Sequence, residues 1–226
     1  MNKFEIELEG GGIMRRKRGW YCFWGVVLTA FAVSFMKLAA FGVDPFQTLL
    51  FSLVSVCPIS YGTLSLLLNG LLLLAAFVWG RNYIGINTFI NLFLLGYMIQ
   101  FVYAGLHDRF PAPGMAARLV LLGLGIVLLC AGNALYTEAA VGVSPYDCIA
   151  LILANKWRIA KFKYCRMPAD TAAVLSGLAV MTLCAGYLTI GSSVGMGTIV
   201  TALFTGPLVQ FFMDRLRLDR TRAKRS

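Results

Sequence analysis

Two short stretches carry the residue types that could bind a ligand, and each surrounds a proline. They read Gly42-Val43-Asp44-Pro45-Phe46-Gln47 and Gly142-Val143-Ser144-Pro145-Tyr146-Asp147. Asp44 and Ser144 are good helix N-caps, and proline suits the first helical position because its missing N–H would have no partner there. Gln47 and Asp147 stand where a capping-box side chain reaches back to the cap. Both stretches therefore predict helix starts, with Gly42, Pro45, Gly142 and Pro145 shaping the backbone.

The same residues also suit a substrate cavity. A short helix that begins inside a membrane protein directs free N–H groups and the positive end of its dipole inward, a common way to hold anionic substrate groups. Asp44, Gln47, Ser144 and Asp147 are therefore candidates for lining such a cavity. The capping and cavity interpretations are compatible, because a cap can also line a site.

Two glycine turns extend this candidate set. They read Gly85-Ile86-Asn87-Thr88 and Gly195-Met196-Gly197-Thr198, and each opens a long apolar segment. Thr88 and Thr198 either cap the following helix or face the cavity together with Asn87, while Gly85, Gly195 and Gly197 are assigned to the turns themselves.

These motifs occur twice in the same order, which indicates an internal duplication. Residues 39–46 match residues 139–146 at an offset of 100, and the glycine turns match at an offset of 110. The extra ten positions fall at a basic stretch, 156–167, in the second half. The chain therefore reads as two repeated halves of a transmembrane bundle.

The composition assigns these halves to a membrane. Hydrophobic residues make up 59% of the 226 residues and charged residues 13%, whereas soluble domains carry about 25% charged residues. Each half contains three long apolar segments and one short one. In order they are 19–41, 46–57, 61–80 and 86–105, then 117–139, 146–155, 168–190 and 197–214. We expect an all-α, polytopic transmembrane helix bundle.

The short segments leave two topologies open. If residues 46–57 and 146–155 complete a crossing, each half crosses four times and the halves are parallel. If they are re-entrant or interfacial, each half crosses three times and the halves are inverted. Counting the arginines at 81, 109 and 118 favours the four-crossing scheme by two residues to one.

Two ionisable residues sit at nearly equivalent repeat positions, Lys37 and Glu138. An ion pair between them would satisfy two charges that are costly in lipid. The alternative is that both side chains extend to the membrane interface.

Several classes of chemistry are excluded by what the chain lacks. It has one histidine, His107, no phosphate-binding loop and no paired carboxylates of a catalytic kind. Its six cysteines are scattered without metal-ligand spacing and read as small buried apolar residues. We therefore expect no catalytic residues, no metal site, no cofactor and no enzyme activity.

The basic residues indicate orientation rather than nucleic-acid binding. The net charge is +10, and fifteen of the twenty basic residues lie in three runs: 15–18, 156–166 and 215–225. These flank apolar segments, as the positive-inside rule requires, and would contact anionic lipid headgroups. We predict cytoplasmic N- and C-termini.

The predicted organisation is a basic N-terminal segment, 1–18, a first membrane repeat, 19–105, a linker, 106–116, a second repeat, 117–214, and a basic tail, 215–226. Residues 1–13 are polar and acidic, and we predict that translation starts at Met14.

The motifs at 42–47, 142–147 and 195–198 resemble the YczE/YyaS/YitT family of bacterial membrane proteins. The resemblance implies a multi-pass protein of the bacterial cytoplasmic membrane.

The paired short helices favour a small secondary transporter or permease-like protein for a small-molecule substrate. The alternative is a non-transporting membrane protein that binds or regulates a partner protein, for which the basic loop 156–167 is the candidate. Both alternatives are compatible with an oligomer.

Overall fold

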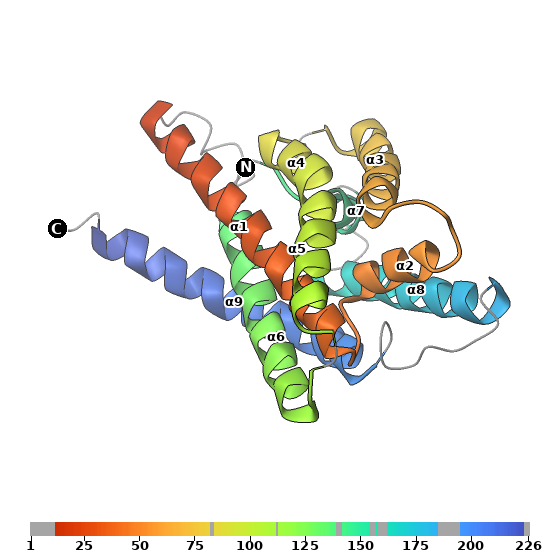
Figure 1. Cartoon of the computed structure of the whole chain (residues 1–226). Coiled ribbons are helices and arrows are strands. Elements are labelled where there is room, and N and C mark those ends of the chain that lie inside the picture. Colours follow the sequence, from red (N-terminus) through yellow and green to blue (C-terminus); the bar gives the residue numbers. More distant parts are fainter. Residues whose placement is uncertain are drawn as a thin grey trace.

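The regular structure of the described residues is entirely helical (Figure 1). A computed structural model describes residues 12–81, 84–111, 113–138, 142–153, 157, 162–184 and 195–223. Its elements are α1 (Gly12–Ala39), α2 (Pro45–Val54), α3 (Tyr61–Trp79), α4 (Ile86–Ile90), the π-helical turn η2 (Asn91–Leu95), α5 (Gly96–Arg109), α6 (Met115–Glu138), α7 (Pro145–Leu151), α8 (Phe162–Cys184) and α9 (Met196–Ala223). The predicted all-α fold class is confirmed for this part of the chain.

Four helices within the described ranges are long and apolar enough to cross a membrane. They cover Gly19–Ala39, Tyr61–Trp79, Ile86–Arg109 and Met115–Thr137. Large apolar side chains such as Leu71, Phe101 and Val120 are exposed on them, which suits a surface solvated by lipid. The apolar helix α2 has only 10 residues.

Helices α1 and α6 run antiparallel and pack closely through glycines. A Cβ atom on Gly25 would lie 2.9 Å from the carbonyl oxygen of Gly132, and one on Gly125 would lie 3.0 Å from that of Ala32. At the far end of the pair, Arg118 Nε donates to the Ala39 carbonyl at 2.7 Å. Small residues allow two helix backbones to approach in this way in lipid.

The segment from α4 through η2 to α5 runs in the same direction as α1. Ile90 and Leu94 pack against Cys22 and Val26 near the start of α1, and Ser34 Oγ further along α1 lies 3.3 Å from the Ile99 carbonyl. Because α6 is antiparallel to α1, the spans α5 and α6 also run in opposite directions (Figure 1).

Helices far apart in sequence pack in a reciprocal pattern. The short helix α2 lies along α8, and the short helix α7 packs against α3. A Cβ atom on Gly177 of α8 would lie 3.3 Å from the Cα atom of Leu49 in α2, and Figure 1 shows these two helices side by side. Each short helix is thus supported by a helix from the other part of the chain.

Two helix boundaries differ from the sequence expectation. Helix α8 begins at Phe162, inside the stretch 156–167 expected to be a loop, and α9 continues to Ala223, into the predicted tail. The helical start of α8 places Arg166 four residues before Asp170, so the two side chains form an intrahelical ion pair at 3.6 Å.

The cysteine prediction is confirmed for four of the six. Cys22, Cys130, Cys148 and Cys165 are buried free thiols.

Candidate functional site

The predicted helix starts are confirmed at α2 and α7. The Asp44 carboxylate accepts a hydrogen bond from the Gln47 backbone N–H at 3.4 Å. The Ser144 hydroxyl accepts one from the Asp147 N–H at 3.1 Å. A proline holds the first helical position of each helix, where its missing N–H costs nothing.

The partners of Gln47 and Asp147 differ from those of a capping box. Gln47 Oε1 accepts a hydrogen bond from the Tyr61 hydroxyl. One oxygen of Asp147 accepts from the Ser144 hydroxyl at 3.0 Å. Gln47 therefore connects the start of α2 to Tyr61 of α3, while this oxygen of Asp147 is bonded to the cap of its own helix.

The glycines before each short helix cross closely over the glycine turns. Gly42 and Gly142 have φ angles of 99° and 114°, a region that side chains other than glycine rarely adopt. A Cβ atom on Gly42 would lie 2.6 Å from the Gly195 nitrogen, and one on Gly142 would lie 2.6 Å from the Gly85 nitrogen. The proline motif at 42–47 therefore packs against the glycine turn at 195–198, and the motif at 142–147 packs against the turn at 85–88.

Hydrogen bonds hold both crossings. Thr88 Oγ1 donates to the Val143 carbonyl at 2.8 Å and accepts from the Gly85 N–H at 3.1 Å. At the other crossing, the Gly197 N–H donates to the Phe41 carbonyl at 2.7 Å. The threonine and glycine residues of the turns thus position the entries to α2 and α7.

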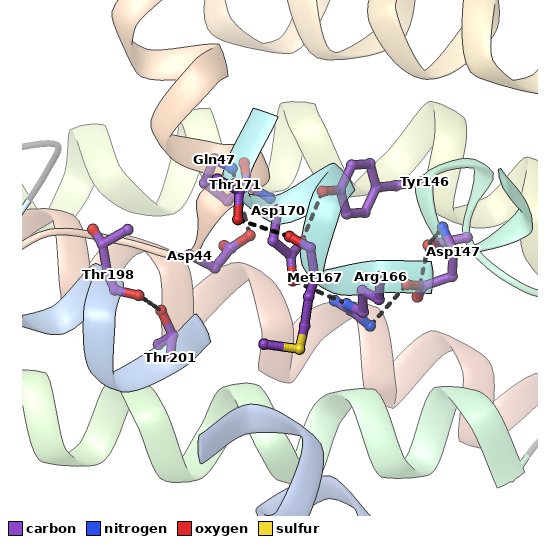
Figure 2. Close-up of polar contacts among 11 residues, drawn as sticks. Asp44, Gln47, Tyr146, Asp147, Arg166, Met167, Asp170, Thr171, Thr198 and Thr201 are labelled. Atoms are coloured by element: carbon purple, nitrogen blue, oxygen red, sulfur yellow. Dashed lines mark hydrogen bonds and ion pairs between the residues drawn. The ribbon is translucent and has the colours of Figure 1, made fainter. Parts of the chain in front are cut away.

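An acidic cluster with one arginine lies where the short helices begin (Figure 2). Arg166 Nη1 lies 2.8 Å from Asp147 Oδ1, and its Nε lies 3.6 Å from Asp170 Oδ2. The Tyr146 hydroxyl donates to Asp170 Oδ1 at 2.7 Å. Arg166 thus links α8 to α7 through Asp147, while its ion pair with Asp170 lies within α8.

Asp44 adds a third carboxylate to this cluster. Its Oδ1 atom is buried and has no hydrogen-bond partner among the described residues, and the carboxylate interacts electrostatically with Asp170 and Arg166. The cluster therefore holds three carboxylates and one guanidinium, and the Asp147 and Asp170 carboxylates form ion pairs with it. The cluster carries an excess of negative charge when all three carboxylates are ionised. The side chains of Arg166 and Asp147 remain 33% and 28% exposed, so the cluster is not fully enclosed by the protein.

Comparisons with known proteins agree with this membrane architecture. A family model described as a family of unknown function, DUF6198, matches residues 16–214. The chain belongs to this family. No solved structure matches it.

Relatives of this DUF6198 protein carry two of the names that its motifs resemble. The uncharacterized membrane protein YczE of Bacillus subtilis is 25% identical over 201 residues, covering 86% of this chain and 85% of the relative. The uncharacterized protein YyaS of the same organism is 22% identical over 189 residues, covering 84% and 89%. An uncharacterized protein of Haemophilus influenzae is 26% identical over 133 residues, covering 58% and 54%. The predicted resemblance and the membrane location are thereby confirmed.

The structure of this DUF6198 protein does not bring Lys37 and Glu138 together. The antiparallel register of α1 and α6 places the end of α1 beside Arg118 and the end of α6 beside Gly25, so the two backbones stand at opposite ends of the pair. The Glu138 side chain lies outside the described residues. Lys37 instead places its Nζ atom 4.3 Å from the centroid of the Phe51 ring.

Arg166 and Asp170 are site residues that sequence reasoning missed. Arg166 was counted with the basic loop, and Asp170 has no charged counterpart in the first half, where Ser60 stands at the offset of 110. The sequence did contain a signal for this pair, because Asp170 follows Arg166 by four positions at the edge of an apolar segment. Charged residues beside an apolar segment are costly in a membrane unless they are paired. Of the predicted candidates, Thr198 is buried beside Gly42, and Asn87 is buried at the start of α4.

Proposed function

We propose that this DUF6198 protein is a small secondary transporter of the cytoplasmic membrane, with its substrate site where α2 and α7 begin. The observation that carries the proposal is the cluster of Asp44, Asp147, Asp170 and Arg166, which combines a buried carboxylate oxygen that has no partner among the described residues with side chains that are partly exposed. Charged groups of this kind inside a membrane bundle are costly and typically mark substrate or ion pathways.

We further propose that the two halves are inverted repeats with three crossings each. Three observations support this proposal: α1 and α6 are antiparallel, α5 follows the direction of α1, and α2 packs against α8 as α7 packs against α3. Parallel halves would give the first helix of each half the same direction. In this scheme α2 and α7 enter the bundle without completing a crossing, and their N-termini meet at the site.

The charge of the cluster favours a cationic substrate over an anionic one. Helix N-termini attract anions when their N–H groups are free, but here Asp44 and Ser144 already cap them. An anion would also meet the Asp147 and Asp170 carboxylates beside the single guanidinium, and Asp44 adds a third negative charge when it is ionised. The sequence expectation of anion binding at these helix starts is therefore replaced by a proposal of cation binding.

The alternative function, a membrane protein that binds a partner through the loop 156–167, stays a prediction. Within that stretch the described residues are 157 and 162–167. The described part of α8 contributes Arg166 to ion pairs with Asp147 and Asp170.

Two-sided accessibility of the site tests the proposal. In a cysteine-free background, Ser144→Cys is treated with a membrane-impermeant thiol reagent in right-side-out and in inside-out vesicles. A transporter that alternates its access predicts labelling from both faces, while Ser65→Cys, at a position only 4% exposed, is the protected control. Labelling of Ser144→Cys from one face only, or from neither, would contradict transport and favour a static protein.

A further inference from the structure

Two deeply buried polar side chains have no hydrogen-bond partner in the part of the chain that the structure describes. Asn87 is 1% exposed, and neither its amide nitrogen nor its amide oxygen forms a hydrogen bond with any residue the structure describes. Tyr136 is 6% exposed, and its hydroxyl is likewise without a partner in the described ranges. Buried polar groups are nearly always hydrogen-bonded, so each exception calls for a ligand, a water molecule or another explanation.

These two side chains belong to helices that both pack against α1. Tyr136 of α6 packs with Cys22 and Val26 of α1, and Ile90 of α4 packs against this cluster. Asn87 lies three residues before Ile90 and therefore shares its side of the helix. Both unpartnered groups thus belong to the junction at which α4 and α6 pack against α1.

The junction adjoins the acidic cluster. The Tyr136 hydroxyl interacts electrostatically with Asp147 and Cys148 at the start of α7. The residue after Asn87, Thr88, donates a hydrogen bond of 2.8 Å to Val143, just before that helix. Asp147 thus interacts both with Arg166 in the acidic cluster and with Tyr136 of the unpartnered pair.

The equivalent positions in the other half carry no such groups. At an offset of 110, Asn87 corresponds to Gly197, and at an offset of 100, Tyr136 corresponds to Met36. A Cβ atom on Gly197 would lie 2.7 Å from the Gly42 carbonyl oxygen, so that position admits no side chain. The polar pair is therefore not a packing requirement of the fold, because the matching crossing is built without it.

We propose that Asn87 and Tyr136 form an inner subsite for the ammonium group of a protonated primary amine, adjoining Asp147. An ammonium group has three N–H donors and no acceptor. The Asn87 amide oxygen and the Tyr136 hydroxyl oxygen are unused acceptors, and Asp147 supplies the compensating charge. The Asn87 amide nitrogen remains a donor for a hydroxyl or carbonyl oxygen elsewhere on the substrate. This inference rests on the proposed function, whose substrate class it names.

Binding of simple ions to the full chain in detergent tests the subsite. The probes are n-butylammonium, butyltrimethylammonium and butyrate at equal ionic strength, and apparent affinities come from the concentration dependence of the unfolding temperature. We expect n-butylammonium to stabilise the wild-type protein and the other two to bind at least about tenfold more weakly, because the quaternary ion lacks N–H donors and butyrate is an anion. Equal binding of the primary and quaternary ions, a preference for butyrate, or no stabilisation by n-butylammonium would overturn the proposal.

Variants of Asn87 and Tyr136 test whether these two residues bind n-butylammonium. Asn87→Ala and Tyr136→Phe should each weaken n-butylammonium binding about tenfold. The matched controls are Asn91→Ala, one turn further along the same segment, and Tyr97→Phe, at a position 45% exposed on α5. Wild-type affinity in both test variants would show that water satisfies the buried groups and would end the proposal. The comparison among probes on the wild-type protein stands even if one variant fails to fold.

The two proposals fail in different ways. Two-sided labelling at Ser144→Cys without amine binding would retain a transporter and reject the substrate class. Amine binding with one-sided labelling would retain the subsite and reject transport.

Discussion

The rings of Phe46 and Tyr146 lie against each other with their centroids 4.7 Å apart and their planes tilted by 31°. These residues occupy matching positions in the two proline motifs, separated by 100 residues in the sequence. Their contact brings the starts of α2 and α7 together, and Tyr146 also donates to Asp170 in the acidic cluster. The aromatic pair thus joins the repeated motifs to the charged site.

Adding a methyl group at either crossing glycine should destabilise the protein. Gly42→Ala and Gly142→Ala combine a positive φ angle with a Cβ atom 2.6 Å from a backbone nitrogen. We expect each to lower the free energy of unfolding by at least about 2 kcal/mol. Unfolding in detergent measures the loss.

The control for that pair is Gly70→Ala within α3. A Cβ atom there would have no neighbour within 4 Å, so the substitution should be neutral or stabilise by about 0.5–1 kcal/mol through helix propensity. Equal effects at Gly70 and at the two crossing glycines would mean that the crossings do not exist as described.

A large side chain placed between α1 and α6 should lower the stability of the protein, because the two helices pack closely. A Cβ atom on Gly25 would lie 2.9 Å from the Gly132 carbonyl oxygen and 2.9 Å from the Tyr136 nitrogen. Gly25→Leu should therefore cost about 3 kcal/mol, at the upper end for overpacking. Gly123→Leu, on α6 with open space around its Cβ position, should be tolerated. Comparable yields and unfolding temperatures for the two variants would contradict the packing.

Sequence patterns could predict the helices and their caps because these depend on local chemistry. Apolar length predicted the four spans Gly19–Ala39, Tyr61–Trp79, Ile86–Arg109 and Met115–Thr137. The Asp44-Pro45 and Ser144-Pro145 pairs marked the starts of α2 and α7, since capping involves neighbours a few residues apart. The start of α8 was missed because Pro168 and the basic residues around it are typical of a loop. The ion pairs of Arg166 within the bundle offset that local preference.

The assembly of the site could not be predicted because it depends on helix direction. The Lys37–Glu138 pairing assumed that matching repeat positions lie side by side. With α1 and α6 antiparallel, matching positions instead lie at opposite ends of the pair. The same helix directions bring Gly142 into contact with Gly85 and allow Asp147 to form an ion pair with Arg166. The spacing of these residues in the sequence does not predict either contact.

Removing the arginine of the acidic cluster should destabilise the protein through its unpaired carboxylates. Arg166→Gln leaves Asp147 and Asp170 without their cation, and we expect a loss of about 2 kcal/mol in unfolding free energy near neutral pH. Adding Asp147→Asn should restore part of it, because the double variant removes one of the repelling charges. Arg109→Gln, at the exposed end of α5, should change stability by less than about 0.5 kcal/mol. Additive losses in the double variant would show that Arg166 and Asp147 do not act as a pair.

The direction of the spans predicts which loops face outward. If the N-terminus is cytoplasmic and α2 does not complete a crossing, α3 returns the chain to the cytoplasm before Arg81, and the span Ile86–Arg109 carries it outward. In intact cells, a membrane-impermeant thiol reagent should therefore label Arg109→Cys and spare Arg81→Cys in a cysteine-free background. Both positions are exposed, and both should be labelled once the membrane is permeabilised. Labelling at Arg81→Cys with protection at Arg109→Cys would mean that α2 crosses the membrane and that the halves are parallel, which would remove the structural basis for inverted repeats.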